Sequence, residues 1–195
     1  MISLWLKIIY TLFVCVLVPV YVRQYGFVNF LWFSDIALLL TVPALWLESS
    51  LLASTMIVAV ILFETLWNVD YFLALITGKK LIGLSAYMFD QTIPLWIRAL
   101  SLFHVVLPLL LLWMVYRLGY DSRAFLFQTI LALILLPVSY LLSTSDENVN
   151  WVYGFGAQPQ TWMPAPLFVL VLMIAFPLLV YLPTHLLMLK IFNPK

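Results

Sequence analysis

Long apolar stretches constrain this chain more than any other feature. Six of them, separated by short polar breaks, are long enough to cross a bilayer, since a spanning helix needs about 20 residues. They cover residues 2–22, 31–47, 51–76, 94–116, 123–142 and 166–191. The apolar character is continuous rather than alternating, which favours helices over a membrane barrel. The sequence therefore predicts an all-α, polytopic transmembrane helical bundle with six spans.

Composition supports a single integral membrane domain over residues 1–195. Hydrophobic residues make up 66% of the chain and charged residues 9%, whereas soluble domains have about 25% charged residues. The net charge of +1 gives no basic field for nucleic acid, and we expect no nucleic-acid partner. The single cysteine, Cys15, can form neither an internal disulfide nor a multi-cysteine metal site. The first stretch is longer than a signal-peptide core, so we expect a retained helix.

Two connecting segments are expected to be partly structured at the membrane interface. Residues 81–92 are apolar, and residues 143–165 are rich in aromatic residues that suit the headgroup level. Six spans put both termini on one side of the membrane. The segment 143–165 carries Asp146 and Glu147 but no lysine or arginine. By the positive-inside rule, we expect a cell-membrane protein with both termini in the cytoplasm.

A few polar residues interrupt the apolar stretches, and charge at membrane depth is costly unless it is partnered. We expect these residues to converge on one pocket between the second, third and fourth spans. They are Ser34 and Asp35 in the second span, Glu64, Asn68 and Asp70 in the third, and Arg98, Ser101 and His104 in the fourth.

Each of these groups also has a structural interpretation. Ser34 and Asp35 are residue types that cap helices, and Glu64 could pair with Arg98 to fix helix packing. The functional interpretation is that a membrane-depth carboxylate orients His104, which can act as a base near neutral pH. No metal-ligand spacing, phosphate loop or nucleotide fingerprint occurs, so we predict neither a metal nor a cofactor.

Three stretches together resemble a family of small, functionally uncharacterised bacterial integral membrane proteins. They are YGFVNFLWFSDIALLLT at 25–41, YMFDQTIPLWIRALSLFH at 87–104 and PQTWMP at 159–164. This resemblance extends over most of the chain and implies no particular activity.

Two shorter stretches, FSDIALLL at 33–40 and LFHVVLPLLLLW at 102–113, resemble the androgen-induced and androgen-dependent membrane proteins. Those six-span enzymes hydrolyse fatty-acid esters of hydroxy fatty acids. The resemblance places Ser34 at the threonine nucleophile of the family and His104 at its histidine. Serine in place of threonine keeps the hydroxyl group, and Asp35 has no counterpart in the family.

These observations lead to the hypothesis of a membrane enzyme that hydrolyses a lipid-like ester or transfers its acyl group. Membrane lipids are its expected partners, and a homo-oligomer is left open. The expected roles are nucleophile for Ser34, base and acid for His104, orienting carboxylate for Glu64 or Asp70, and substrate binding for Asp35, Asn68, Arg98 and Ser101. Two alternatives remain: a non-catalytic protein that binds or transports a lipid, small molecule or ion, and a structural subunit of a membrane complex.

Overall fold

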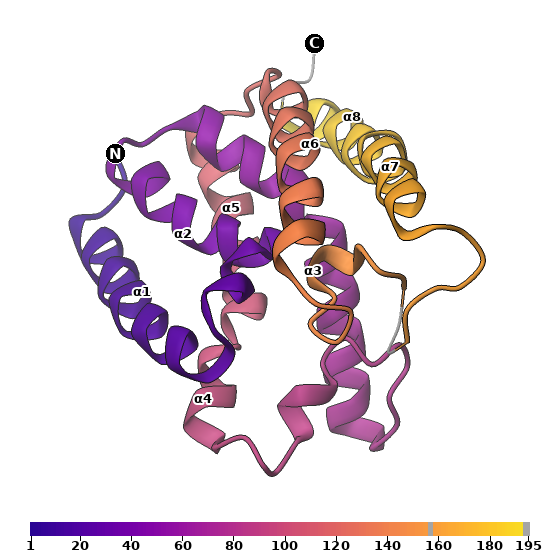
Figure 1. Ribbon diagram of the computed structural model, residues 1–195. Coiled ribbons are helices and arrows are strands. Elements are labelled where there is room, and N and C mark those ends of the chain that lie inside the picture. Colours follow the sequence, from indigo (N-terminus) through magenta and orange to yellow (C-terminus); the bar gives the residue numbers. More distant parts are fainter. Residues whose placement is uncertain (156–157, 193–195) are drawn as a thin grey trace.

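The computed structural model describes residues 1–155 and 158–192, and every regular element in these ranges is helical (Figure 1). The prediction of an all-α bundle is confirmed. The main helices are α1 (Leu4–Tyr25), α2 (Phe33–Trp46), α3 (Ser50–Thr77), α4 (Leu95–Leu100), α5 (Phe103–Leu118), α6 (Ala124–Leu142), α7 (Ala165–Ala175), the π-helical η4 (Phe176–Tyr181) and α8 (Leu182–Phe192). Short 3-10 turns form η1 (Phe27–Leu31), η2 (Ala86–Phe89) and η3 (Val149–Trp151) in the connections.

Successive helical segments run in opposite directions, so the bundle has an upper and a lower end in Figure 1. Glu48, between α2 and α3, accepts hydrogen bonds from the Ile2 N–H (3.0 Å) and from Lys7 Nζ (2.8 Å). The N–H of Asp121, between α5 and α6, donates to Ser54 Oγ near the start of α3 (2.9 Å). These contacts bring the start of α1 and two turns together at the upper end. The end of α1 and the starts of α2 and α5 therefore lie at the lower end.

Five helical segments are long and apolar enough to cross a membrane. They are Leu4–Tyr25, Ser50–Thr77, Leu95–Leu118, Ala124–Leu142 and Ala165–Phe192. The predicted second span is observed as α2, which has 14 residues and is about 21 Å long at 1.5 Å per residue. That length is shorter than a hydrocarbon core of about 30 Å. Five of the six predicted spans are therefore matched by helices of spanning length.

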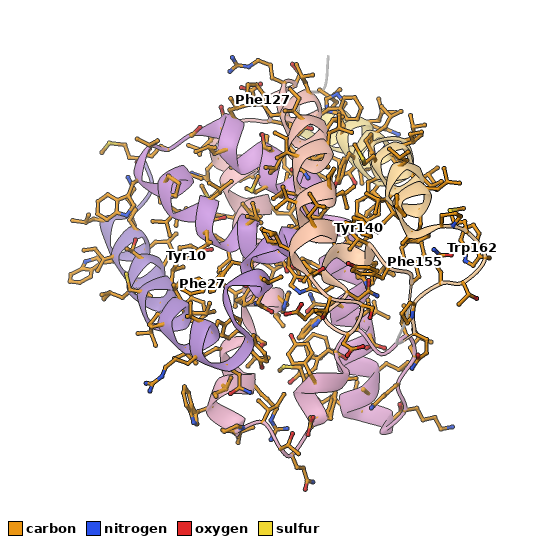
Figure 2. All side chains as sticks on the ribbon, viewed as in Figure 1. Tyr10, Phe27, Phe127, Tyr140, Phe155 and Trp162 are labelled. Carbon is orange, nitrogen blue, oxygen red and sulfur yellow. The ribbon has the colours of Figure 1, made fainter. Side chains whose placement is uncertain are left out.

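The outer surface of the bundle is covered by large apolar side chains (Figure 2). Trp5 on α1 is 73% exposed and Leu179 on η4 is 72% exposed. Phe127, near the upper end in Figure 2, and Trp162, in the connection before α7, are also exposed. Exposure of so much apolar surface is unusual for a soluble protein. It is compatible with a multi-pass membrane protein.

The central helix of the bundle is α3, which packs against α2, α5 and α6. Small side chains such as Ala53 and Ala59 are fully buried in these contacts and let the helices approach closely. Because α3 has neighbours on several sides, both of its carboxylates are buried in the protein interior. Glu64 is 2% exposed and Asp70 is 0% exposed.

The predicted fourth span is broken into two helices. The chain leaves α4 through a tight turn, in which the Ser101 N–H donates to the Arg98 carbonyl (3.0 Å) and the His104 N–H donates to the Ser101 carbonyl (3.1 Å). Helix α5 then begins at Phe103. This break brings Ser101 and His104 to the interior at the lower end of the bundle.

Candidate functional site

A cavity of about 920 Å³ lies within the lower half of the bundle. Its lining comes from the end of α1, η1, the start of α2, the middle of α3, the start of α5 and the two connecting segments that carry η2 and η3. Nine of its lining residues are aromatic: Tyr21, Tyr25, Trp32, Phe33, Phe63, Trp67, Tyr87, Trp151 and Phe155. Its polar lining residues are Asn29, Ser34, Asp35, Glu64, Ser101, His104 and Asn150.

The centre of the site is a carboxylate–imidazole pair. His104 Nδ1 lies 3.0 Å from Glu64 Oε1 and 2.9 Å from Glu64 Oε2. The Glu64 side chain is 2% exposed and that of His104 is 14% exposed. A carboxylate at Nδ1 favours the tautomer in which Nδ1 carries the proton. His104 Nε2 has no hydrogen-bond partner among the described residues, so this nitrogen is left free to accept a proton.

Neighbouring side chains hold the His104 ring in place. The Trp67 ring stacks on it with 4.6 Å between ring centroids, and the adjacent Phe103 ring lies 4.0 Å away. Asn68 Nδ2 donates to the His104 carbonyl (2.8 Å) and to the Glu64 carbonyl (2.7 Å). Asn68, expected to bind substrate, is not among the residues that line the cavity. Its amide instead ties α3 to the start of α5.

Ser34 and Asp35 reach the cavity from the first turn of α2. The helix begins at Phe33, whose N–H donates to Asn150 Oδ1 (3.1 Å), so the cap comes from a distant asparagine. Ser34 is half-buried and lines the cavity, and no hydrogen bond joins it to His104 in the described structure. Asp35 is 4% exposed. Its Oδ2 has a long contact with Asn29 Nδ2 (3.5 Å), and its Oδ1 has no hydrogen-bond partner in the part of the chain that the structure describes.

Hydroxyl groups gather on the wall beside the α4–α5 break. Tyr21 Oη and Ser101 Oγ are 2.6 Å apart. Burial and the nearby Tyr21 raise the pKa of Tyr87 well above its usual range, and a hydrogen bond with Ser101 opposes that rise. All three residues line the cavity, so its polar end offers neutral donors and acceptors.

Asp70, the second carboxylate expected to orient the histidine, lies elsewhere. Its Oδ1 accepts hydrogen bonds from the backbone N–H groups of Leu81 (3.1 Å), Ile82 (2.8 Å) and Gly83 (3.1 Å). Its Oδ2 accepts from the N–H (2.9 Å) and Oγ (2.7 Å) of Ser85. Asp70 does not line the cavity. It folds the connecting segment that supplies Ile82, Gly83 and neighbouring residues to the cavity wall.

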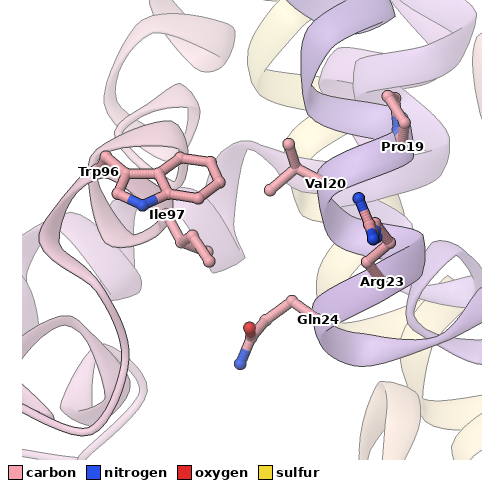
Figure 3. A pocket seen from close by; sticks show the side chains of 6 residues that line it. All are labelled: Pro19, Val20, Arg23, Gln24, Trp96 and Ile97. Atoms are coloured by element: carbon pink, nitrogen blue, oxygen red, sulfur yellow. The ribbon is translucent and has the colours of Figure 1, made fainter.

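Arg98 also lies outside the set of residues that line the cavity. Its Nη1 donates to the Met88 carbonyl (2.8 Å), which attaches α4 to η2. A separate pocket of about 320 Å³ lies between α1 and α4, where Arg23, Gln24 and Trp96 surround it together with Pro19, Val20 and Ile97 (Figure 3). Neither arginine therefore faces the Glu64–His104 pair.

The structure thus brings Ser34, Asp35, Glu64, Ser101 and His104 together around one cavity. Sequence reasoning missed the residues that complete it, chiefly Tyr21, Trp67, Tyr87 and Asn150. Aromatic residues within apolar stretches carry no signal that separates them from ordinary packing. Asn150 lies in a connecting segment, and its positive φ of 54° is the kind of strained backbone that often accompanies functional sites.

No group of three or more histidine, cysteine, aspartate or glutamate side chains that could hold a metal occurs within residues 1–155 and 158–192. No protein-family model, curated protein or solved structure matched this chain. The assignment of function therefore depends on the geometry of the cavity.

Proposed function

We propose that this protein is an integral membrane enzyme that hydrolyses a lipid or lipid-like ester, or transfers its acyl group, within the cavity. The observation that carries the proposal is the buried Glu64–His104 pair on a cavity wall that also presents the Ser34 hydroxyl. A hydroxyl, an imidazole and a carboxylate are the three groups of a nucleophilic triad.

The proposed reaction has two stages. Ser34 Oγ attacks the ester carbonyl while His104 Nε2 accepts the hydroxyl proton. The carbon–oxygen bond to the alcohol then breaks, and His104 returns the proton to the departing oxygen. Water, or a second alcohol in the transfer reaction, then attacks the acyl carbon of the acyl-serine while His104 again accepts the proton. The bond from the acyl carbon to Ser34 Oγ breaks, and His104 returns the proton to Ser34. Glu64 holds the imidazole and stabilises its charged form in both stages.

The start of α2 suits the negative charge that develops on the carbonyl oxygen. The backbone N–H groups of Ser34 and Asp35 belong to its first turn and have no hydrogen-bond partners among the described residues. Free N–H groups and the helix dipole both favour an anion at this position. We propose that these donors stabilise the oxyanion of the tetrahedral intermediate.

The proposal also includes the placement of the chain in the cell membrane. We propose that η1 and α2 together make one further crossing, so that six crossings put both termini on the same side of the membrane, and that this side is the cytoplasm. The aromatic cavity walls accept the apolar chain of the lipid, and the membrane is its source.

Kinetics of alanine variants would test this function. Ser34→Ala and His104→Ala should each lower kcat for a fatty-acid ester by at least about 1,000-fold, as expected for members of a triad. Ser122→Ala and His185→Gln are the matched controls, because Ser122 is exposed between α5 and α6 and His185 hydrogen-bonds Tyr120 away from the cavity. A Ser34→Ala variant that is folded and fully active would rule out the mechanism.

A second candidate is a non-catalytic lipid-binding protein. The observation that favours it is the absence of a hydrogen bond between Ser34 and His104 within the described residues, although such bonds are often loose in unliganded enzymes. A lipid that co-purifies intact with the wild-type protein and survives prolonged incubation would support this alternative.

A further inference from the structure

The cavity is poor in positive charge. Two carboxylates line it, Asp35 and Glu64, whereas no lysine or arginine is among its lining residues. Among the described residues that line the cavity, His104 is the one group that can become cationic, and Glu64 already faces it. An anionic head group would therefore enter a site with a net negative field and find no free cation.

Three buried polar atoms on the cavity wall have no hydrogen-bond partner within residues 1–155 and 158–192. They are Asp35 Oδ1, the Tyr25 hydroxyl and Trp67 Nε1. A buried polar atom without a partner is costly, and such groups often mark a bound molecule. Asp35 Oδ1 can only be satisfied by a hydrogen-bond donor when the carboxylate is ionised. Trp67 Nε1 requires an acceptor, which an ester oxygen can supply.

Asp35 is also placed next to the proposed nucleophile. Ser34 and Asp35 are consecutive in the first turn of α2 and both line the cavity, so a group bound to Asp35 and an ester that reacts at Ser34 share one cavity.

We infer that the preferred substrate is a lipid ester whose alcohol part carries a hydrogen-bond donor, either a hydroxyl or an ammonium group, and no negative charge. Asp35 receives that donor. This inference rests on the proposed function and specifies the substrate class at the same site. It differs from the expectation that Arg98 binds the substrate, because Arg98 bonds the Met88 carbonyl and does not line the cavity.

The test compares four octanoyl esters of similar size in detergent micelles. Their alcohol parts are 2-hydroxyethyl, 2-(dimethylamino)ethyl, propyl and carboxymethyl. The first two should have kcat/KM values about tenfold or more above the last two, which is the effect of one charge-assisted hydrogen bond. The relative rates of the hydroxyl and ammonium esters identify which of the two donors the site takes.

Asp35→Asn keeps the shape of the side chain and removes its charge. This variant should reduce the ratio of the kcat/KM values for the hydroxyethyl and carboxymethyl esters to about threefold or less. Asp90→Asn is the matched control, because Asp90 is exposed, its carboxylate accepts hydrogen bonds from Thr92, and it is not among the residues that line the cavity. Equal turnover of all four esters by the wild-type protein, or preference for the carboxymethyl ester, would overturn the inference. Because this comparison uses wild-type protein, it decides the question even if the Asp35 variant does not fold.

Octyl ethers with the same four end groups separate this inference from the proposed function. They cannot be hydrolysed, and their binding is measured as a rise in the unfolding temperature of the protein. If no ester is cleaved but the hydroxyl or ammonium ether alone stabilises the protein, the catalytic proposal fails and the head-group inference stands. Stabilisation by none of the ethers, or equally by all, together with no ester turnover, overturns both.

Discussion

His104 Nδ1 lies 2.9 Å from Glu64 Oε2, and the two residues belong to neighbouring helices that meet at the wall of an aromatic cavity. A carboxylate at this nitrogen keeps a proton on Nδ1 and leaves Nε2 as the basic atom. The pair links a structural feature, the contact between α3 and α5, to the proposed chemistry.

Glu64→Gln tests that link. Glutamine keeps the size of the side chain but cannot stabilise a charged imidazole. It can also donate its amide N–H to His104 Nδ1, which favours the tautomer with the proton on Nε2 and removes the basic atom from the cavity side. We expect kcat for ester hydrolysis to fall by at least about 100-fold. The measurement is kcat at saturating ester for protein that still shows a cooperative thermal transition. A variant within threefold of wild type would show that Glu64 is not the orienting carboxylate.

Asp70→Asn should alter the connecting segment without a direct effect on the chemistry. The Asp70 carboxylate accepts five hydrogen bonds from residues 81–85, and loss of its charge should destabilise the protein by roughly 2 kcal/mol. Trypsin cleavage after Lys79 and Lys80, both exposed next to this segment, should become faster. Asp90→Asn again serves as the control. Unchanged cleavage would mean that Asp70 does not hold the segment.

Asn150→Ala should weaken the attachment of the last long connection to α2. Asn150 accepts from the Phe33 N–H (3.1 Å) and donates to the Leu31 carbonyl (2.8 Å) and Ser139 Oγ (2.9 Å). Alanine loses these hydrogen bonds and disfavours the φ of 54°. We therefore expect the free energy of unfolding to fall by about 2–3 kcal/mol. Glycine tolerates that φ, so the free energy of unfolding should fall less in Asn150→Gly than in Asn150→Ala. Thermal or denaturant unfolding in detergent measures the stability of both variants. Equal losses of stability in the two variants would exclude a contribution from the backbone conformation.

Stability at the upper end of the bundle should depend on acid pH through Glu48. Hydrogen bonds from Lys7 and from the Ile2 N–H lower the pKa of Glu48 below its ordinary value. Its contribution is therefore present above the ordinary carboxyl pKa and is lost as the pH falls through the lowered one. Glu48→Gln should remove this part of the pH dependence. A difference in stability between the wild type and the variant that stays constant from neutral to strongly acid pH would contradict the prediction.

Part of this arrangement could be predicted from the sequence. Continuous apolar stretches identify the helices, and the cost of a carboxylate at membrane depth singles out Glu64 as a residue that needs a partner. Asp70 has a similar sequence setting but very different partners. Its carboxylate binds backbone N–H groups, which every residue other than proline carries, so no residue type marks them in the sequence.

Long-range contacts account for most of what the sequence could not provide. Tyr21 and Ser101 are 80 positions apart, and Phe33 and Asn150 are 117 apart. The break between α4 and α5 occurs at Ser101–Leu102, where neither proline nor glycine marks it. Tertiary packing, rather than local propensity, therefore places the hydroxyl cluster and the cap of α2.

The central claim is that Ser34 is a nucleophile activated by His104. The most direct measurement is mass spectrometry of the peptide containing Ser34 after treatment of the protein with a long-chain fluorophosphonate. We predict a covalent adduct on Ser34 in the wild-type protein and the His185→Gln control, and at least about 100-fold slower labelling in His104→Ala. An unmodified Ser34 peptide in folded wild-type protein, or labelling that does not depend on His104, would contradict the account.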